Sequence, residues 1–155
     1  MRENAGLRHL VVFTLDDGRY GLALSTVERV VQAVDITPLP KAPDIVYGVI
    51  NIRGRIVPVM NVRRRFRLPE RQINLSDQLV VARTSRRPVA LMVDAVSGTV
   101  QCSREAVVAA DRIFPDLQYV EGVVRTRDGM ILIHDLDKFL GLDEEQALGA
   151  ALANA

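Results

Sequence analysis

The amino-acid sequence predicts a mainly β fold that consists of two small barrels. Short apolar segments alternate with turn residues along most of the 155-residue chain, a pattern typical of β-sandwiches and barrels. Segments with helical spacing are short and lie near the C-terminal end. The expected strands form two clusters of similar size on either side of Asp77, with no convincing sequence repeat between them. We therefore expect two small barrels rather than one large barrel.

Before Asp77, strands are expected at residues 10–15, 20–24, 27–34, 46–52 and 55–61. Residues 16–18 form a turn, and Arg53-Gly54 joins the last two strands because glycine supplies the positive φ of a tight hairpin. Three prolines within residues 38–43 rule out regular structure there. Pro58 cannot donate a ladder hydrogen bond, so its position is predicted at a sheet edge or a bulge.

A helical turn at 62–66 and a loop at 72–74 lead to the second cluster of strands. Strands are expected there at residues 79–83, 89–96, 119–126 and 130–134, with a break or bulge at Gly98 and an irregular segment at 103–116. A short helix at 136–140 should end at Gly141 as a left-handed C-cap, and Asp143 should cap a terminal helix. Leu148 and Leu152 recur at helical spacing, so this helix should pack on its own barrel. The alternative is a detachable interaction segment.

The composition excludes several classes of protein. Twenty basic residues against 19 acidic ones leave a net charge of +1, which argues against nucleic-acid binding through bulk charge. The single Cys102 cannot form an internal disulfide, so nothing requires an oxidising compartment. No apolar run approaches the roughly 20 residues that span a bilayer, and the first residues do not resemble a signal peptide. We expect a cytoplasmic protein without direct membrane insertion.

Residues that support catalysis or metal binding are scarce. The two histidines, His9 and His134, lie at opposite ends of the chain, so four Cys/His ligands for zinc cannot be assembled. The segment His134-Asp135-Leu136-Asp137 resembles a catalytic His–Asp pair. A dyad without a third partner has little to activate, and an Asp135 that caps a short helix is the preferred interpretation. The sequence predicts no enzyme.

One segment carries a family resemblance. Residues 48–59 read Gly-Val-Ile-Asn-Ile-Arg-Gly-Arg-Ile-Val-Pro-Val and resemble the signature of the CheW family, adaptors that couple chemoreceptors to the histidine kinase CheA. Tyr20-Gly21-Leu22 resembles an earlier strand of that family, residues 89–96 with Asp94 resemble a central strand, and residues 130–140 resemble the closing strand and helix. Such an ordered set over about 130 residues is far more specific than one short motif.

The resemblance implies two SH3-like, five-stranded barrels packed side by side, with a CheW-like domain at 8–142 and a C-terminal helix at 143–155. It implies a protein of two-component signalling without catalytic activity, cofactor or metal. Its implied partners are the regulatory domain of a CheA-like histidine kinase and the cytoplasmic tip of a methyl-accepting chemoreceptor. The receptor tip would lie in an apolar cleft between the barrels.

The resemblance also implies two overlapping sets of contact residues. The receptor-binding set is Val27, Arg29, Val30, Gly48 and Arg53. The kinase-binding set is Asn51, Arg53, Arg55 and Pro58. The residue types leave structural alternatives open, because Asn51 and Arg53 suit a hairpin turn, Gly48 suits a special backbone conformation, and Val27 and Val30 suit an ordinary core.

Two features favour other functions. The family usually carries glutamate where this chain has Arg29, with Glu28 one step earlier, and a reversed charge at an interface favours a different partner. An adaptor for a non-chemotactic kinase pathway is therefore one alternative. The other is a nucleic-acid-binding SH3-like barrel. A run of arginines could bind nucleic acid or an acidic protein partner: Arg53, Arg55, Arg63, Arg64, Arg65, Arg67 and Arg71. A solvated face is the simpler interpretation of that run, and no nucleic acid is expected because aromatic residues are not interleaved.

Overall fold

The computed structural model describes residues 6–32, 35–109 and 119–154. The strands are β1 (Leu7–Leu15), β2 (Gly18–Ala23), β3 (Val27–Gln32), β4 (Val46–Ile52), β5 (Arg55–Met60), β6 (Gln78–Arg83), β7 (Pro88–Val93), β8 (Ala95–Ser103), β9 (Val108–Ala109), β10 (Val120–Thr126) and β11 (Gly129–His134). The helices are α1 (Val62–Arg65), α2 (Leu142–Ala153) and the short 3₁₀ turns η2 (Leu24–Thr26), η3 (Arg104–Ala106) and η5 (Leu136–Lys138). Within the described ranges, no helix combines the length and apolarity needed to cross a membrane.

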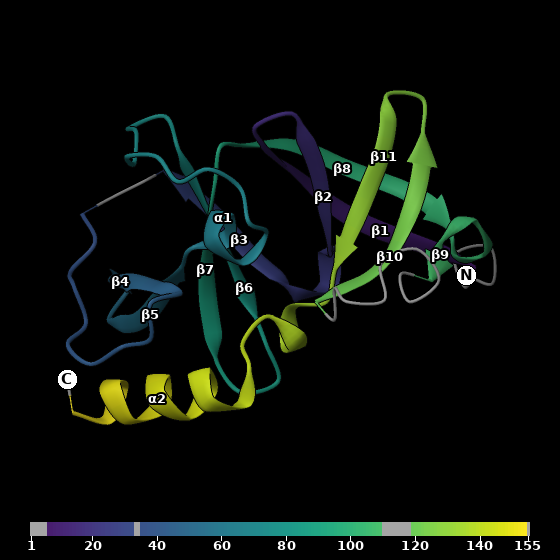
Figure 1. Cartoon of the computed structure of the whole chain (residues 1–155). Helices are drawn as coiled ribbons and strands as arrows, with labels where there is room; N and C mark the ends of the chain where they lie inside the picture. Colours follow the sequence, from purple (N-terminus) through teal and green to yellow (C-terminus); the bar gives the residue numbers. More distant parts are fainter. Residues whose placement is uncertain (1–5, 33–34, 110–118, 155) are drawn as a thin grey trace.

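The strands form two separate sheets, as Figure 1 shows. One has the order β8-β1-β2-β11-β10-β9 and the other the order β3-β6-β7-β5-β4. The predicted fold class is confirmed: mainly β, with two SH3-like barrels, few helices and a C-terminal helix. The strands expected at 10–15, 46–52, 55–61 and 79–83 lie close to their predicted positions. Parts of two predictions, residues 33–34 of the third strand and 110–116 of the irregular segment, lie outside the described residues.

The expected division of the strands at Asp77 is wrong. β6 and β7 follow Asp77 but complete the sheet of β3–β5, whereas β1 and β2 join β8–β11. Two parallel pairings produce this arrangement: β5 beside β7, with Val59 opposite Ala90, and β2 beside β11, with Tyr20 opposite Leu132. Such pairings join segments far apart in sequence, so strand spacing along the chain does not reveal them.

The two sheets contain equivalent hairpins, although the sequence shows no convincing repeat. The β4–β5 and β10–β11 hairpins share one register, because Gly48 pairs with Val59 and Gly122 pairs with Ile133, each beside a bulge. Neither glycine has room for a side chain. A Cβ on Gly48 would lie 2.3 Å from the carbonyl oxygen of Thr37, and a Cβ on Gly122 would lie 2.9 Å from that of Val108.

Each hairpin leads into a short helix that holds a turn of the other sheet. After β5, the Arg63 guanidinium on α1 lies 2.8 Å from the Asp16 carboxylate in the β1–β2 turn. After β11, the Asp137 carboxylate on η5 accepts a hydrogen bond of 2.7 Å from the backbone N–H of Ser85 in the β6–β7 turn. Each half therefore anchors the other at an equivalent place.

Pro58 is not at a sheet edge, because β5 lies between β4 and β7. Its partner Val49 directs both backbone hydrogen bonds to Thr37, away from β5, so the Val49–Pro58 pair exchanges none. On the other side, pairing with β7 begins only at Val59. Pro58 is therefore tolerated in an interior strand because no ladder hydrogen bond is required of it. The nearest bulge lies between Val46 and Gly48 of the neighbouring strand.

Three other expectations change in detail. The strand expected at 89–96 divides at Asp94, where the chain passes from β7 in one sheet to β8 in the other. A bulge does occur next to Gly98, because Val12 pairs with Gly98 and Phe13 with Val96. Gly141 is not a left-handed C-cap: its φ is −68°, and it begins α2 by donating its N–H to Glu144, which leaves Asp143 in the first turn. Asp135 does cap the short helix as expected, since its carboxylate accepts a hydrogen bond from the N–H of Asp137.

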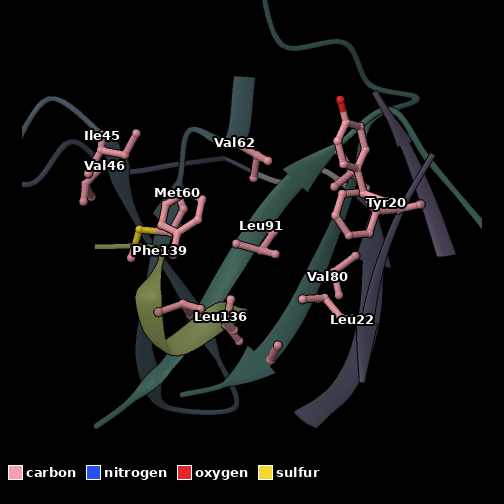
Figure 2. Packing of buried hydrophobic residues seen from close by; sticks show 14 of the residues in the cluster. Tyr20, Leu22, Ile45, Val46, Met60, Val62, Val80, Leu91, Leu136 and Phe139 are labelled. Carbon is pink, nitrogen blue, oxygen red and sulfur yellow. The ribbon is translucent and has the colours of Figure 1, made fainter. Parts of the chain in front are cut away.

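The main hydrophobic core lies between the sheets and contains side chains from both. Figure 2 shows Tyr20 and Leu22 of β2 packed with Val80, Leu91 and other residues of the second sheet. Phe139 and the fully buried Leu148 of α2 belong to the same cluster, which confirms that the terminal helix packs on the barrel. Side chains of both sheets therefore fill most of the space where an apolar cleft between the barrels was expected. Cavities remain beside the junction: one of about 220 Å³, with Met60, Val89, Leu136 and Phe139 in its wall, and one of about 100 Å³, with Arg83 and Glu121 in its wall.

Candidate interaction surface

The β4–β5 hairpin ends in a rigid, exposed turn. Arg53 and Gly54 have φ values of 52° and 84°, and two central residues with positive φ are characteristic of a type I′ turn. The Asn51 side-chain oxygen accepts a hydrogen bond of 2.8 Å from the N–H of Gly54. Asn51 therefore stabilises the turn backbone. The turn leaves the side chains of Arg53 and Arg55 exposed.

The turn is joined to β3 by an ion pair. Arg55 Nη2 lies 2.6 Å from Glu28 Oε2, and Arg83 Nη1 at the end of β6 lies 3.4 Å from Glu28 Oε1. The hydrogen bond from Arg55 lowers the pKa of the Glu28 carboxyl, with a smaller contribution from Arg83. Since β3 and β5 are not neighbours in the sheet, this ion pair brings the hairpin and β3 together on one surface.

A β-bulge places Glu28 on this surface. Val27 pairs with Ala82 and Arg29 with Val81, so Glu28 is the additional residue on β3. Val30 is 38% exposed and Ile56, which follows Arg55, is 51% exposed, but strand alternation places both on the other face of the sheet from Arg55 and Arg83. We call the charged set the arginine face: Glu28, Arg53, Arg55 and Arg83. Arginine is enriched in protein–protein interfaces.

The structure separates the predicted contact residues into two groups. Val30, Arg53, Arg55 and the turn residue Asn51 are exposed, and the two arginines belong to the arginine face. The others have structural surroundings: Val27 packs against the main core, Gly48 is enclosed by Thr37, Pro58 is buried, and Arg29 is half-buried. A binding role for either set stays a prediction.

Sequence reasoning did not select Glu28 or Arg83 as members of a site. Glu28 was noted only as a displaced acid, and the bulge that turns it outward has no local sequence signal. Arg83 approaches it only because β6 pairs with β3. Glu28 and Arg83 can be recognised as an ion pair only when the pairing of β3 with β6 is known.

The expected basic run is largely neutralised within the chain. Arg63 is only 6% exposed and bridges Asp16 and Asp94, at 2.8 and 2.9 Å. Arg71 bridges Asp77 and Asp94, at 2.7 and 2.6 Å. Two further arginines pair in the same way, Arg64 with Glu70 and Arg65 with Glu144. A continuous basic surface for nucleic acid is therefore absent from this part of the described structure.

The His134-Asp135 segment does not form a catalytic pair. The His134 ring is buried, with its centroid 5.2 Å from that of Phe66 and 5.3 Å from that of Phe139, and neither ring nitrogen has a hydrogen-bond partner among the described residues. Burial, with a smaller contribution from Arg65, lowers the pKa of His134 to about 3. A neutral, enclosed imidazole cannot exchange protons with a substrate at neutral pH, so the proton-transfer alternative is contradicted.

Known proteins resemble this chain over most of its length. A family model of the CheW-like domain matches residues 9–144. The chemotaxis protein CheW of Treponema pallidum is 28% identical over 145 residues, covering 90% of this chain and 85% of that protein. The chemotaxis protein CheW of Thermotoga maritima is 30% identical over 128 residues, covering 83% and 84%. The crystal structure of the scaffolding protein TtCheW from Thermoanaerobacter tengcongensis superimposes with a TM-score of 0.81 at 30% identity, covering 88% of this chain and 94% of that one. The signature at residues 48–59, the paired barrels and these likenesses together place the chain in the CheW family.

Proposed function

We propose that this protein is a non-enzymatic cytoplasmic adaptor that couples chemoreceptors to the histidine kinase CheA. The observation that carries the proposal is the match to the CheW-like domain across residues 9–144, in a chain whose relatives are chemotaxis proteins. The name of the structural neighbour, a scaffolding protein, supports the same role. The arginine face supplies a surface of suitable character for a protein partner.

In this proposal the β4–β5 hairpin contacts the regulatory domain of the kinase. Arg53 and Arg55 make the polar contacts, while Asn51 and Pro58 hold the hairpin in shape. The receptor tip contacts the outer side of β3 through Val30, with Arg53 at the border of both sites and Arg29 beside them. Val27 and Gly48 support these contacts from below, because both are enclosed by the chain itself.

A receptor that docks on the outside does not need an open cleft. Entry between the sheets would displace the core that contains Tyr20 and Leu91. Contacts on β3 and the hairpin avoid that cost and keep the adaptor rigid. A receptor can then bias the kinase only through contacts that differ between the active and inactive states of the kinase. Modest individual interfaces gain strength when many of them are linked in an array.

The test is the affinity of the purified chain for the CheA regulatory domain, measured by isothermal titration calorimetry. Arg53→Glu should weaken binding by at least about tenfold, because it reverses a charge at the centre of the proposed contact. Its melting temperature should stay close to that of the wild type, since Arg53 is exposed and has no ion pair among the described residues.

The matched control is Arg127→Glu, because Arg127 follows Thr126 at the β10–β11 turn as Arg53 follows Ile52 at the β4–β5 turn. It should leave this affinity within about twofold of the wild-type value, the range of a surface change away from the contact. A wild-type chain that does not bind the CheA regulatory domain would contradict the proposed function. Equal losses in both variants would contradict the placement of the contact on the β4–β5 hairpin.

A further inference from the structure

The arginine face holds more positive than negative charge. Three guanidinium groups, those of Arg53, Arg55 and Arg83, are associated with a single carboxylate, that of Glu28. Glu28 is the only described acid within ion-pair distance of Arg55 or Arg83, and Arg53 has no ion pair with any described residue. This surface therefore carries an excess of two positive charges.

The remaining arginines near the junction have a different environment. Arg63 and Arg71 share three carboxylates, Asp16, Asp77 and Asp94, so that cluster has excess negative charge. Although the chain as a whole is nearly neutral, the arginine face therefore carries local positive charge. A surface of this kind attracts a partner that presents carboxylates.

We infer that the arginine face docks an acidic surface of the kinase regulatory domain, and that Glu28 limits the affinity by competing with that surface for Arg55 and Arg83. The inference rests on the proposed function and adds to it the chemistry of the partner and a residue that sets affinity. It gives the displaced glutamate a role: Glu28 is an internal counter-ion that an acidic partner replaces.

The geometry of the pairs makes such replacement possible. The side chains of Arg55 and Arg83 are 44% and 62% exposed while paired with Glu28. Ion pairs at such exposure are weak, because water and salt screen them. A partner carboxylate can therefore replace Glu28 without breaking a buried interaction. Arg53 is held outward by the type I′ turn, so it is available before this exchange takes place.

The decisive variant is Glu28→Gln, which removes the competing charge and keeps the size of the side chain. Its affinity for the CheA regulatory domain should rise about threefold to tenfold near 50 mM salt, and the gain should shrink near 300 mM salt because screening shortens the range of the attraction. Arg83→Glu should weaken binding at low salt. Calorimetric titration at both salt concentrations measures these changes, and circular dichroism confirms that each variant is folded.

Glu121→Gln is the matched control, because Glu121 forms an exposed ion pair with Arg8 in the other half of the chain. It should leave affinity unchanged. If Glu28→Gln binds more weakly or equally well, the inference is overturned, since Glu28 would then be either a direct contact or irrelevant. If Glu28→Gln gives either result while Arg53→Glu still weakens binding, the proposed function is retained and only the inference about Glu28 is overturned. If the wild-type chain does not bind at all, both fail.

Discussion

Replacing Arg63 by methionine should lower the free energy of unfolding by about 3 kcal/mol, the lower end of the range for removing one partner of a buried ion pair. The guanidinium bridges Asp16 and Asp94 and also donates to the carbonyl oxygen of Pro69 at 2.9 Å. Its loss leaves Arg71 as the one described cationic partner of Asp94. Burial raises the pKa of the Asp94 carboxyl, but hydrogen bonds from Arg63, the Asp16 backbone and Arg71 outweigh this effect and lower it.

Urea denaturation followed by circular dichroism measures this loss. Arg64→Met is the control on the same short helix, because Arg64 pairs with Glu70 at the surface, where an ion pair contributes about 0–1 kcal/mol. A difference of at least about 2 kcal/mol between the two variants is expected from their difference in burial. Equal losses would show that the Arg63 bridge contributes no more than an exposed pair.

Mild acid should destabilise the protein through His134. Its pKa in the folded chain is about 3, whereas an unperturbed histidine titrates near 6.5, so below pH 6.5 the unfolded chain takes up a proton that the folded chain refuses. The contribution of neutral His134 to the free energy of unfolding is therefore fully present above pH 7, and it decreases as the pH drops from 6.5 toward 3. The expected loss between pH 7 and pH 5 is about 2 kcal/mol, from about 1.4 kcal/mol per pH unit.

The His134→Met variant should lose most of this dependence between pH 7 and pH 5. Methionine is the residue at the equivalent place in the other half, where Met60 pairs with Val46 as His134 pairs with Val120. Urea midpoints at several pH values give the comparison. The Asp94 carboxylate, whose pKa is lowered, also loses stabilising interactions in acid, but only at lower pH. A variant that kept the full slope between pH 7 and 5 would exclude His134 as its source.

Local features of the fold were predictable because they depend on neighbouring residues. The hairpin at Arg53-Gly54 follows from the φ that glycine allows, and the packing of α2 follows from the spacing of Leu148 and Leu152. Gly141 was assigned the wrong cap because a glycine between two helical segments suits either the end of one or the start of the next. Here, Glu144 selects the second by accepting the Gly141 N–H.

The pairing of distant strands was not predictable in this way. Nothing within residues 7–23 indicates that they complete a sheet with β8–β11, so the division was expected at Asp77. The repeat was also missed, although Gly48-Val49 and Gly122-Val123 begin equivalent hairpins, because the two halves share few other residue types. A buried Arg63 gave no signal either, since its three partner groups come from separate segments.

The candidate surface was predictable in part. The resemblance selected Val30, Arg53 and Arg55, which the structure leaves exposed, and it also selected Pro58 and Val27, which the chain covers. A motif records which residues recur together but not whether they act by contact or by supporting the backbone. Burial separates these roles, and the Glu28 bulge adds a residue that no linear pattern contains.

The interleaved order of the strands has a consequence for synthesis on the ribosome. The sheet of β3–β7 is contiguous between Val27 and Val93, so it can close while the remainder of the chain is still being made. β1 and β2 emerge first but must wait for β8 and β11 before their outer hydrogen bonds are satisfied. During that interval an apolar hairpin is available to other nascent chains, and the Asp16 turn can be held by Arg63 and by Asp94, which directly follows β7.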